Sequence, residues 1–189
     1  CEAKPLVEHF DLKKDVSVQP FAVYVNHDIC LTVTGLGKSA MAAGVAYTQA
    51  LFVKVEHPVI LNIGIAGHKE HLLGDLFLID KIIDIDSQKS YYPSLVFTPP
   101  CPTGSIQTSS KPQLNYESAH LCDMEASAFY ETAVRFSSSE FILCLKVISD
   151  NQLSTVENIQ PKQVSALIAA HLATVESLLV RTATQAGLI

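Results

Sequence analysis

Apolar runs with little alternation indicate the strands of this chain. Val59 to Ile63 and Phe141 to Ile148 hold β-branched and other apolar residues at consecutive positions, a pattern typical of strands that are buried on both faces. Leu76 to Ile85 is long and apolar enough for a third strand. Phe21 to Asn26 and Ile29 to Thr34 are separated by a short polar turn and predict a hairpin.

Helical spacing of apolar residues predicts three longer helices. The segment from Ser39 to Phe52 is rich in alanine and has few polar side chains, so we expect this helix to be largely buried. A second helix runs from Asp123, a suitable N-cap, to about Phe136. A third runs from Pro161, which suits a first helical turn, to about Arg181. Strands that alternate with helices indicate the α/β class.

The segment from Asp86 to Ser118 has a different character. It contains five prolines together with many serines and threonines, which predicts mostly irregular structure. Short strands are expected only near Leu95 to Thr98 and near Ser105 to Thr108. Because long irregular segments are uncommon inside compact domains, we expect this one to be functional or mobile.

The length, charge and apolar content of the chain argue against some classes of partner. A length of 189 residues suits one domain, and the net charge of −6 with only two arginines argues against a nucleic-acid partner, which requires a basic face. No apolar run reaches the length of a membrane span, and the first residues do not have the pattern of a signal peptide. Five cysteines without C-x-x-C spacing predict free thiols and a cytoplasmic protein.

Two glycine-containing turns are predicted after strands. Gly35-Leu36-Gly37-Lys38-Ser39-Ala40 is similar to a dinucleotide-binding loop and also contains the Gly-Lys-Ser of a phosphate-binding loop. A phosphate-binding loop would need glycine at Thr32, and a dinucleotide site would need an acid near Asn62, so a tight strand-to-helix turn is favoured. Gly64-Ile65-Ala66-Gly67 predicts a second turn, where small residues would let a ligand approach the backbone.

Two acidic residues stand at the ends of buried elements. Glu125 opens the second predicted helix, and Asp150 follows the strand that ends at Ile148. Each has a structural interpretation, because an acid favours a helix N-terminus and an aspartate can cap the segment after it. In open α/β sheets, however, ligands bind outside the carboxyl ends of the strands. Glu125 and Asp150 are therefore the leading candidates for functional acids.

The histidines do not predict a metal site. His68 and His71 lie three residues apart in a polar loop, and no third ligand is visible in the sequence nearby. His171 falls on the apolar face of the last predicted helix, where a histidine with a hydrogen-bonding role in the core is the commoner case. We therefore expect neither a metal nor another cofactor.

Five short motifs resemble those of one protein family. Asp123-Met124-Glu125-Ala126-Ser127-Ala128 resembles the Met-Glu-Ala segment of the nucleoside phosphorylase/nucleosidase superfamily, and Ile148-Ser149-Asp150 resembles its catalytic Ser-Asp. The two glycine turns, the second of them followed by Gly74-Asp75, and Glu2-Ala3-Lys4-Pro5-Leu6 occur in the order and spacing of the family. The chain is most similar to the methylthioadenosine/S-adenosylhomocysteine nucleosidase-like members.

The resemblance implies a fold and an activity. The fold would be a three-layer α/β/α domain with a twisted mixed central sheet, nucleoside phosphorylase-like, over residues 1–189 and without part of the usual N-terminal strand. The activity would be cleavage of the N-glycosidic bond of a purine nucleoside with release of the free base. A homodimer is implied as well.

The resemblance also implies roles for particular residues. Asp150 would donate a proton to N7 of the base, which Ser149 would help to orient. Glu125 would bind the ribose hydroxyls, Met124 would pack on the sugar, and Glu2 would activate the attacking water. Three residues would complete the substrate site: Ile65, Ala66 and Gly67.

The nucleophile is left open between water and phosphate. A phosphorylase binds phosphate through arginine forks or through a lysine with backbone donors. Arg135 and Arg181 fall in predicted helices away from the glycine turns, and Lys38 alone is a weak candidate. Water is therefore favoured, with a phosphorylase and a non-catalytic nucleoside-binding protein as the alternatives.

Overall fold

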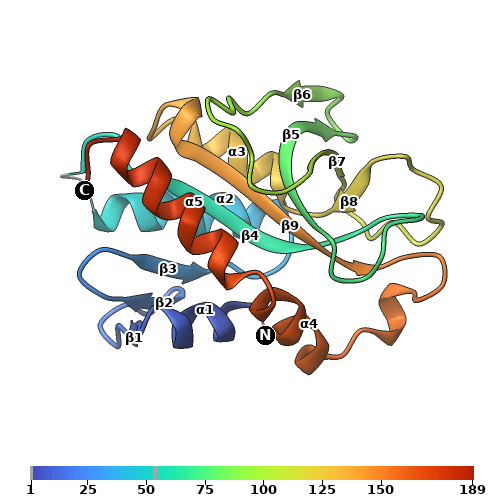
Figure 1. Ribbon diagram of the computed structural model, residues 1–189, viewed down its shortest axis with the longest axis horizontal. Helices are drawn as coiled ribbons and strands as arrows, with labels where there is room; N and C mark the ends of the chain where they lie inside the picture. The colour runs from blue at the N-terminus through green and yellow to red at the C-terminus, as the bar shows by residue number, and fades with distance from the viewer. Residues whose placement is uncertain (1, 53–54) are drawn as a thin grey trace.

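A computed structural model describes residues 2–52 and 55–189 of the chain (Figure 1). Its centre is a six-stranded mixed sheet with the strand order β6-β5-β7-β8-β4-β9. The strands are β4 (Ile60–Gly67), β5 (Leu76–Asp84), β6 (Lys89–Tyr91), β7 (Thr103–Thr108), β8 (Leu121–Asp123) and β9 (Ile142–Asp150). Strand β5 pairs with both β7 and β9, so the sheet curls back on itself.

A small antiparallel sheet lies beside the central one. It consists of β1 (Lys13–Lys14), β2 (Ala22–Val25) and β3 (Cys30–Val33). The predicted hairpin is confirmed: Val25 pairs with Cys30, and the Asn26 side chain closes the turn by accepting hydrogen bonds from the backbone amides of Asp28 and Ile29.

Helices cover both faces of the central sheet (Figure 1). The longer elements are α1 (Ala3–His9), α2 (Lys38–Leu51), α3 (Ala126–Ala133), α4 (Pro161–Ala169) and α5 (Leu172–Gln185), and two short 3-10 helices are η1 (Ser139–Phe141) and η2 (Val156–Asn158). Helices α2 and α3 pack on one face, and α1, α4 and α5 pack on the other. The predicted three-layer α/β/α fold with a mixed central sheet is confirmed.

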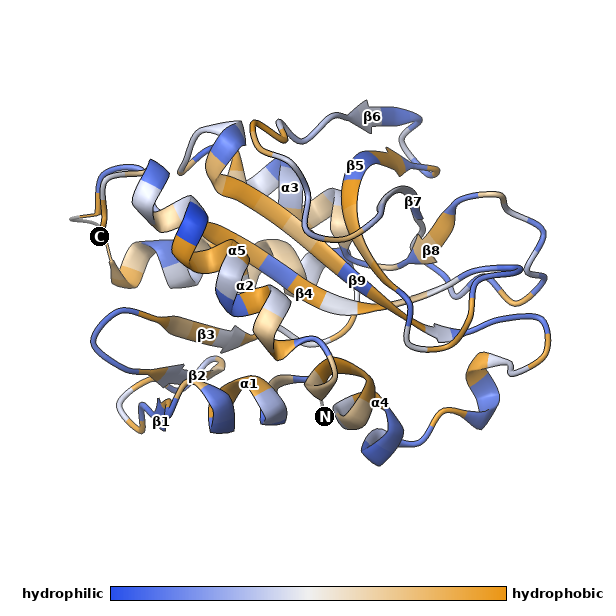
Figure 2. Ribbon diagram, viewed as in Figure 1, coloured by the Kyte–Doolittle hydropathy of each residue, from blue (hydrophilic) through white to orange (hydrophobic). Residues whose placement is uncertain are grey.

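Strand β9 joins the two cores. All nine of its residues are buried, as the unbroken apolar run predicts. Ile142, Cys144 and Ile148 pack toward α2 and α3, whereas Leu143, Leu145 and Val147 pack toward α1, α4 and α5. Strands β4 and β9 form an apolar band through the middle of the molecule (Figure 2). Because side chains alternate along a strand, Lys146 lies on the face that α2 and α3 cover. The pairing of β9 with β4 then shifts register, since Ala66 pairs with Ile148 and Gly67 with Asp150.

The second predicted turn is wrong. Gly64 to Gly67 are the last residues of β4, and they pair in parallel with β9 from Lys146 to Asp150. Small residues here allow close side-chain approach from β9. A Cβ on Gly64 would lie 2.9 Å from Lys146 Nζ, and one on Gly67 would lie 2.5 Å from Asp150 Oδ2.

The proline-rich segment contains two strands, β6 and β7, and only one of them lies where the sequence predicts a strand. The strand expected near Ser105 to Thr108 is confirmed as β7, a central strand whose Ile106 is fully buried. The strand expected near Leu95 to Thr98 is wrong, because these residues belong to an irregular connection between β6 and β7. Leu95 and Phe97 still pack on the core beside α5, so their apolar character serves packing without strand pairing.

The predicted helices need three corrections. Helix α2 is less buried than expected, since only Met41, Gly44 and Val45 are buried in it. Helix α3 starts at Ala126 and ends at Ala133, a turn earlier than expected. The C-terminal helix is broken into α4 and α5, which meet at an angle of 55°. At the break, the ring of His171 is hydrogen-bonded to the carbonyl oxygen of Gly74 at 2.6 Å.

Within the described parts of the chain, no single helix has the length and apolar character needed to cross a membrane. Helices α4 and α5 meet that criterion only when they are taken together as a bent pair.

Gly44 tests how tightly α2 packs against the end of β3. A Cβ at this position would lie 2.4 Å from Thr34 Cγ2, so the neighbouring threonine would have to move. Alanine favours a helix over glycine by about 1 kcal/mol. We expect Gly44→Ala nevertheless to lower the melting temperature, and a Gly44→Ala, Thr34→Ser double variant to recover part of the loss. A higher melting temperature for the single variant would contradict this packing.

Candidate active site

The ends of β4, β8 and β9 meet at one end of the central sheet. Gly67 is paired with Asp150 of β9 on one side and with Cys122 of β8 on the other. The backbone amide of His68 then donates a hydrogen bond to the carbonyl oxygen of Asp150 at 3.1 Å. The chain passes from β8 directly into Met124 and Glu125, so both predicted acids belong to this region.

The carboxyl group of Asp150 is enclosed by polar contacts. The hydroxyl of Ser149 donates to Oδ1 at 2.6 Å, and the hydroxyl of Tyr116 donates to Oδ2 at 2.8 Å. The residue is only 6% exposed. Burial and the hydrogen bond to Asp150 raise the pKa of Tyr116 to about 12, so this phenol keeps its proton at neutral pH and donates a hydrogen bond.

Glu125 is held by two backbone amides at the start of α3. Gly37 donates to Oε1 at 2.7 Å, and Met124 donates to Oε2 at 3.3 Å. Burial raises the pKa of Glu125 above its ordinary value, while the positive charge of Lys146 opposes that shift. Gly37 has φ 91°, a conformation that favours glycine. The glycine turn before α2 is thus a tight turn whose exposed amide positions an acid far away in the sequence.

A buried ion pair supports this end of the sheet. Lys146 Nζ lies 3.0 Å from Asp123 Oδ2, and the two side chains are 2% and 1% exposed. Burial alone would lower the pKa of Lys146, but the carboxylates of Asp123 and Glu125 reverse this, and its pKa is raised. Asp123 also accepts hydrogen bonds from the Thr108 hydroxyl at 2.7 Å and the Ala126 amide at 2.8 Å. Both carboxyl oxygens of Asp123 therefore have partners in the buried interior.

Glu2 approaches β4 from the N-terminal end of α1. Its Oε1 accepts a hydrogen bond from the backbone amide of Ile65 at 3.1 Å and faces the small residue Gly64. Ile65 is two positions from Gly67, a separation of about 7 Å along a strand. Glu2 and Asp150 thus contact neighbouring stretches of the same strand.

Of the remaining predicted site residues, Ala66 and Met124 lie beside the acids or Ser149, whereas the side chain of Ile65 does not. Ala66 is buried, and its carbonyl oxygen lies 3.4 Å from the Ser149 hydroxyl. Met124 is half-buried next to Glu125. The side chain of Ile65, by contrast, packs with the core on the α1, α4 and α5 side, and only its backbone amide faces Glu2.

The sequence does not indicate Tyr116 or Lys146 as residues of this region. It indicates Asp123 only as a helix N-cap and not as the ion-pair partner of Lys146. Lys146 carried a usable signal, because a lysine inside a buried apolar strand requires a buried acidic partner. Tyr116 carried none, since it lies in the irregular segment and its bond to Asp150 spans 34 residues.

His68 is a buried histidine rather than part of an exposed loop. It is 6% exposed, and its Nδ1 accepts hydrogen bonds from the amides of Glu70 at 3.1 Å and His71 at 3.0 Å. Its ring stacks on that of His71 with 3.9 Å between the centroids. Burial lowers the pKa of His68 from 6.5. Within the described residues, no group of three His, Cys, Asp or Glu side chains could hold a metal ion.

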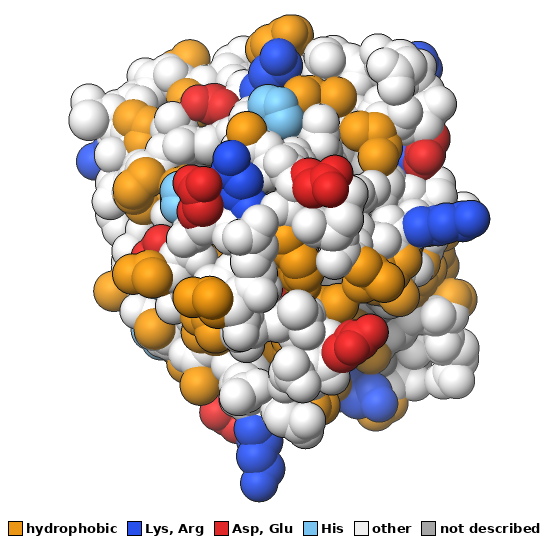
Figure 3. Space-filling view, turned by 90° about the vertical axis from the view of Figure 1, so that its right-hand side faces the viewer, with side chains coloured by type: hydrophobic (Ala, Val, Ile, Leu, Met, Phe, Trp, Pro, Cys, Tyr) orange, Lys and Arg blue, Asp and Glu red, His pale blue; other side chains and the backbone are white. Residues whose placement is uncertain are grey.

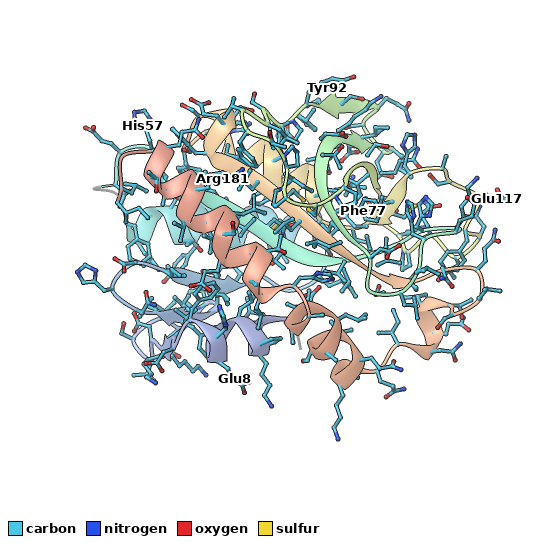
Figure 4. All side chains as sticks on the ribbon, viewed as in Figure 1. Glu8, His57, Phe77, Tyr92, Glu117 and Arg181 are labelled. Carbon is cyan, nitrogen blue, oxygen red and sulfur yellow. The ribbon has the colours of Figure 1, made fainter. Side chains whose placement is uncertain are left out.

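The candidate anion-binding cations are engaged elsewhere. Lys38 Nζ lies 2.7 Å from Asp84 and 2.6 Å from Asp86. The guanidinium of Arg135 donates to the Glu131 carbonyl oxygen within α3. Arg181 donates to the Thr98 carbonyl oxygen and lies over the front of the sheet, whereas Glu117 marks the opposite, site-bearing end of the molecule (Figure 4).

Comparison with solved structures identifies the fold. The 5′-methylthioadenosine/S-adenosylhomocysteine nucleosidase from Helicobacter pylori superposes with a TM-score of 0.69 and 15% identity, over 93% of this chain and 94% of that one. The chain has the nucleosidase fold. The 5′-methylthioadenosine nucleosidase of Arabidopsis thaliana gives a TM-score of 0.69 with 18% identity, over 96% of this chain and 91% of that one.

A third solved structure has the same fold. The futalosine hydrolase of Helicobacter pylori gives a TM-score of 0.67 with 16% identity, over 93% of each chain. No family model and no curated protein sequence matches the chain. The nucleosidase fold is thus shared at a low level of sequence identity, and the chemistry of this chain must be argued from its own residues.

The buried ion pair can be tested by breaking it from one side. Asp123→Ala would leave the Lys146 ammonium buried without its nearest carboxylate, which costs about 3–5 kcal/mol of stability. The double variant Asp123→Asn, Lys146→Met removes both charges, and we expect it to lose less than the single variant. Chemical denaturation measures the free energy of unfolding of both variants. A double variant that loses more than Asp123→Ala would contradict the pairing.

The neutral state of His68 makes stability depend on pH. Its pKa is lowered in the folded state, so the unfolded chain binds more protons near pH 6.5, and the folded state loses stability as the pH falls through that region. We expect the difference in unfolding free energy between pH 7.5 and pH 5 to be smaller for His68→Asn, which keeps an acceptor but does not titrate. An equal difference for both proteins would show that His68 does not contribute.

Proposed function

We propose that the protein hydrolyses the N-glycosidic bond of a purine nucleoside and releases the free base. The observation that carries the proposal is that three acids lie on or beside the neighbouring strands β4, β8 and β9. Asp150 ends β9, Glu125 opens α3, and Glu2 contacts β4. The likeness in fold to methylthioadenosine and S-adenosylhomocysteine nucleosidases supports a substrate of that type.

In the proposed reaction Asp150 is the general acid. Its proton passes to N7 of the base as the bond between the base and C1′ breaks, and the bonding electrons leave with the neutral base. Ser149, bonded to Oδ1 at 2.6 Å, fixes the orientation of the carboxyl group. Acids beside the sugar stabilise the oxocarbenium-like transition state of glycosidic cleavage.

The other acids act on the sugar and the water. Glu125 binds the ribose hydroxyls, and Met124 packs on the sugar. Glu2 accepts a proton from a water molecule whose oxygen then bonds to C1′. Ala66 and Gly67 are proposed to lie beside the ribosyl group, with Gly67 leaving room for the carboxyl group of Asp150. The role of Ile65 in this scheme is limited to its backbone, because its side chain packs on the opposite face.

Water is proposed as the nucleophile for an electrostatic reason. A phosphate ion beside Glu2 and Glu125 would need cationic donors to offset the repulsion. Arg135 and Arg181 bond to backbone carbonyl oxygens outside the site, and Lys38 is neutralised by two aspartates. Lys146 is already paired with Asp123. These engagements favour hydrolysis over phosphorolysis.

We further propose a cytoplasmic homodimer. The described cysteines Cys30, Cys101, Cys122 and Cys144 are free thiols, which suits a reducing compartment, and Cys1 lies outside the described residues. The pairing of two copies is an expectation from the resemblance to nucleosidases. Light scattering of the purified protein tests it directly, and a monomer at micromolar concentration would contradict it.

Replacing the general acid tests the proposed function. Asp150→Asn should lower the release of base from 5′-methylthioadenosine or adenosine by about 100-fold or more, because amide nitrogen cannot supply the proton. Asp28→Asn, the same chemical change at an exposed hairpin residue, should leave the rate unchanged. Full turnover by Asp150→Asn would refute the assignment, and turnover that requires added phosphate would favour a phosphorylase.

A further inference from the structure

Tyr116 contacts the proposed general acid from outside the predicted catalytic set. It lies in the connection between β7 and β8 and is 8% exposed. Its hydroxyl donates to Asp150 Oδ2 at 2.8 Å and accepts a hydrogen bond from the backbone amide of Val156 at 2.8 Å. The tyrosine thus connects the segment before β8 with the end of β9 and with η2.

The direction of these hydrogen bonds determines what Asp150 can do. A phenol has one proton, and because the hydroxyl accepts from Val156, that proton points at Asp150. The Ser149 hydroxyl donates to the other carboxyl oxygen at 2.6 Å. Both oxygens of the Asp150 carboxyl group therefore accept a hydrogen bond. In this arrangement Oδ2 is occupied by the phenol and is not free to bond to a base.

The backbone of Tyr116 is held in an uncommon conformation. Its φ of 48° lies in the left-handed region, which bulky residues rarely adopt. The side chain of Gln152 donates to the carbonyl oxygen of Tyr116 at 3.1 Å, so residues after β9 hold both the hydroxyl and the backbone. Backbone conformations of this kind gather at switch regions and ligand sites. The next residue, Glu117, extends outward at the edge of the molecule (Figure 4).

The surface around this segment suits movement more than rigid packing. The end of the molecule that carries the connection between β7 and β8 shows apolar, acidic and basic side chains interspersed, without one dominant patch (Figure 3). Leu114 and Leu153, on the two segments that Tyr116 and Gln152 join, are 59% and 97% exposed. Few apolar contacts therefore oppose separation of the two segments once the hydrogen bonds of Tyr116 are broken.

We propose that Tyr116 competes with the base of the substrate for Asp150 Oδ2 and sets the affinity of the site for its ligand. The proposal rests on the proposed function, because it takes Asp150 as the group that meets the base. The base nitrogen and the phenol oxygen need the same carboxyl oxygen. When Tyr116 withdraws, Oδ2 takes up a proton from solvent and donates it to the base nitrogen. That proton then leaves with the free base.

The test compares three variants in binding and in turnover. Tyr116→Phe removes the competing hydroxyl and keeps the ring. Gln152→Ala keeps the Tyr116 hydroxyl but removes the hydrogen bond to the Tyr116 carbonyl oxygen, which loosens the segment around Tyr116. Because Gln152 is exposed, this change should not impair folding. Tyr130→Phe is the matched control, since it removes another buried phenol, one in α3 whose hydroxyl is bonded to Ser139 at 2.6 Å. Adenine is the binding probe in calorimetry, and 5′-methylthioadenosine is the substrate.

The expected result is tighter binding in both test variants. A hydrogen bond to a charged group corresponds to about a tenfold change in a binding constant or more. We expect Tyr116→Phe to lower the Kd of adenine and the KM of the nucleoside about tenfold, and Gln152→Ala to lower both by less. Tyr130→Phe should change neither. If the wild-type protein shows no adenine binding in calorimetry but Tyr116→Phe binds adenine, the competition is supported as well.

Other outcomes separate the two proposals. A wild type that releases base, together with a Tyr116→Phe variant whose Kd is unchanged or higher, would overturn competition and leave the function standing. Tyr116 would then only position Asp150. If Tyr116→Phe does not fold, Gln152→Ala decides: a lower Kd supports competition, and an unchanged or higher Kd overturns it. If no protein of the set binds adenine or releases base, both the function and the competition are wrong.

Discussion

The parallel pairing of β4 with β9 is the constraint on which the site depends. The two strands run side by side from Ile60 and Ile142 to Gly67 and Asp150. Strand β9 carries Lys146 and Asp150, and β4 places Gly64 and Gly67 opposite them. A Cβ at Gly64 would lie 2.9 Å from Lys146 Nζ, and one at Gly67 would lie 2.5 Å from Asp150 Oδ2. The absence of two side chains on one strand therefore creates the space for two polar side chains on the other.

Polar side chains that are buried in a core require hydrogen-bonding or ionic partners. Lys146 is neutralised by Asp123, and Asp123 is in turn bonded to Thr108 and to the amide of Ala126. Asp84 is paired with Lys38 and accepts a hydrogen bond from Ser127 at 2.6 Å. Together these bonds tie β5, β7, β8, β9 and the first turns of α2 and α3 into one polar layer. Glu125 and Asp150 are supported by elements whose own positions are tightly specified.

The fold could be predicted from the sequence where burial dictates the residue pattern. The run from Phe141 to Ile148 is apolar at nearly every position because two cores cover β9, and Asp150 marks its end. The hairpin of β2 and β3 followed from a local turn. Strand β7 was only partly visible, and β6 was missed, since short strands among prolines are defined by pairing with distant partners rather than by their own pattern.

The sequence indicates Glu125 and Asp150 as candidate acids because each stands at the end of an element. It does not indicate their supporting contacts, because Gly37 contacts Glu125 over 88 residues and Tyr116 contacts Asp150 over 34. No local pattern encodes such contacts. Gly64 to Gly67 looked like a turn for a related reason: small residues suit turns, but here they serve side chains that approach from another strand.

Hydrolysis in water enriched in 18O tests the central claim most directly. The purified protein is incubated with 5′-methylthioadenosine in phosphate-free buffer, and the released sugar is analysed by mass spectrometry. If water attacks C1′ as proposed, the free base appears together with a sugar that carries one 18O atom. A sugar phosphate formed only after phosphate is added, or no release of base at all, would contradict the account.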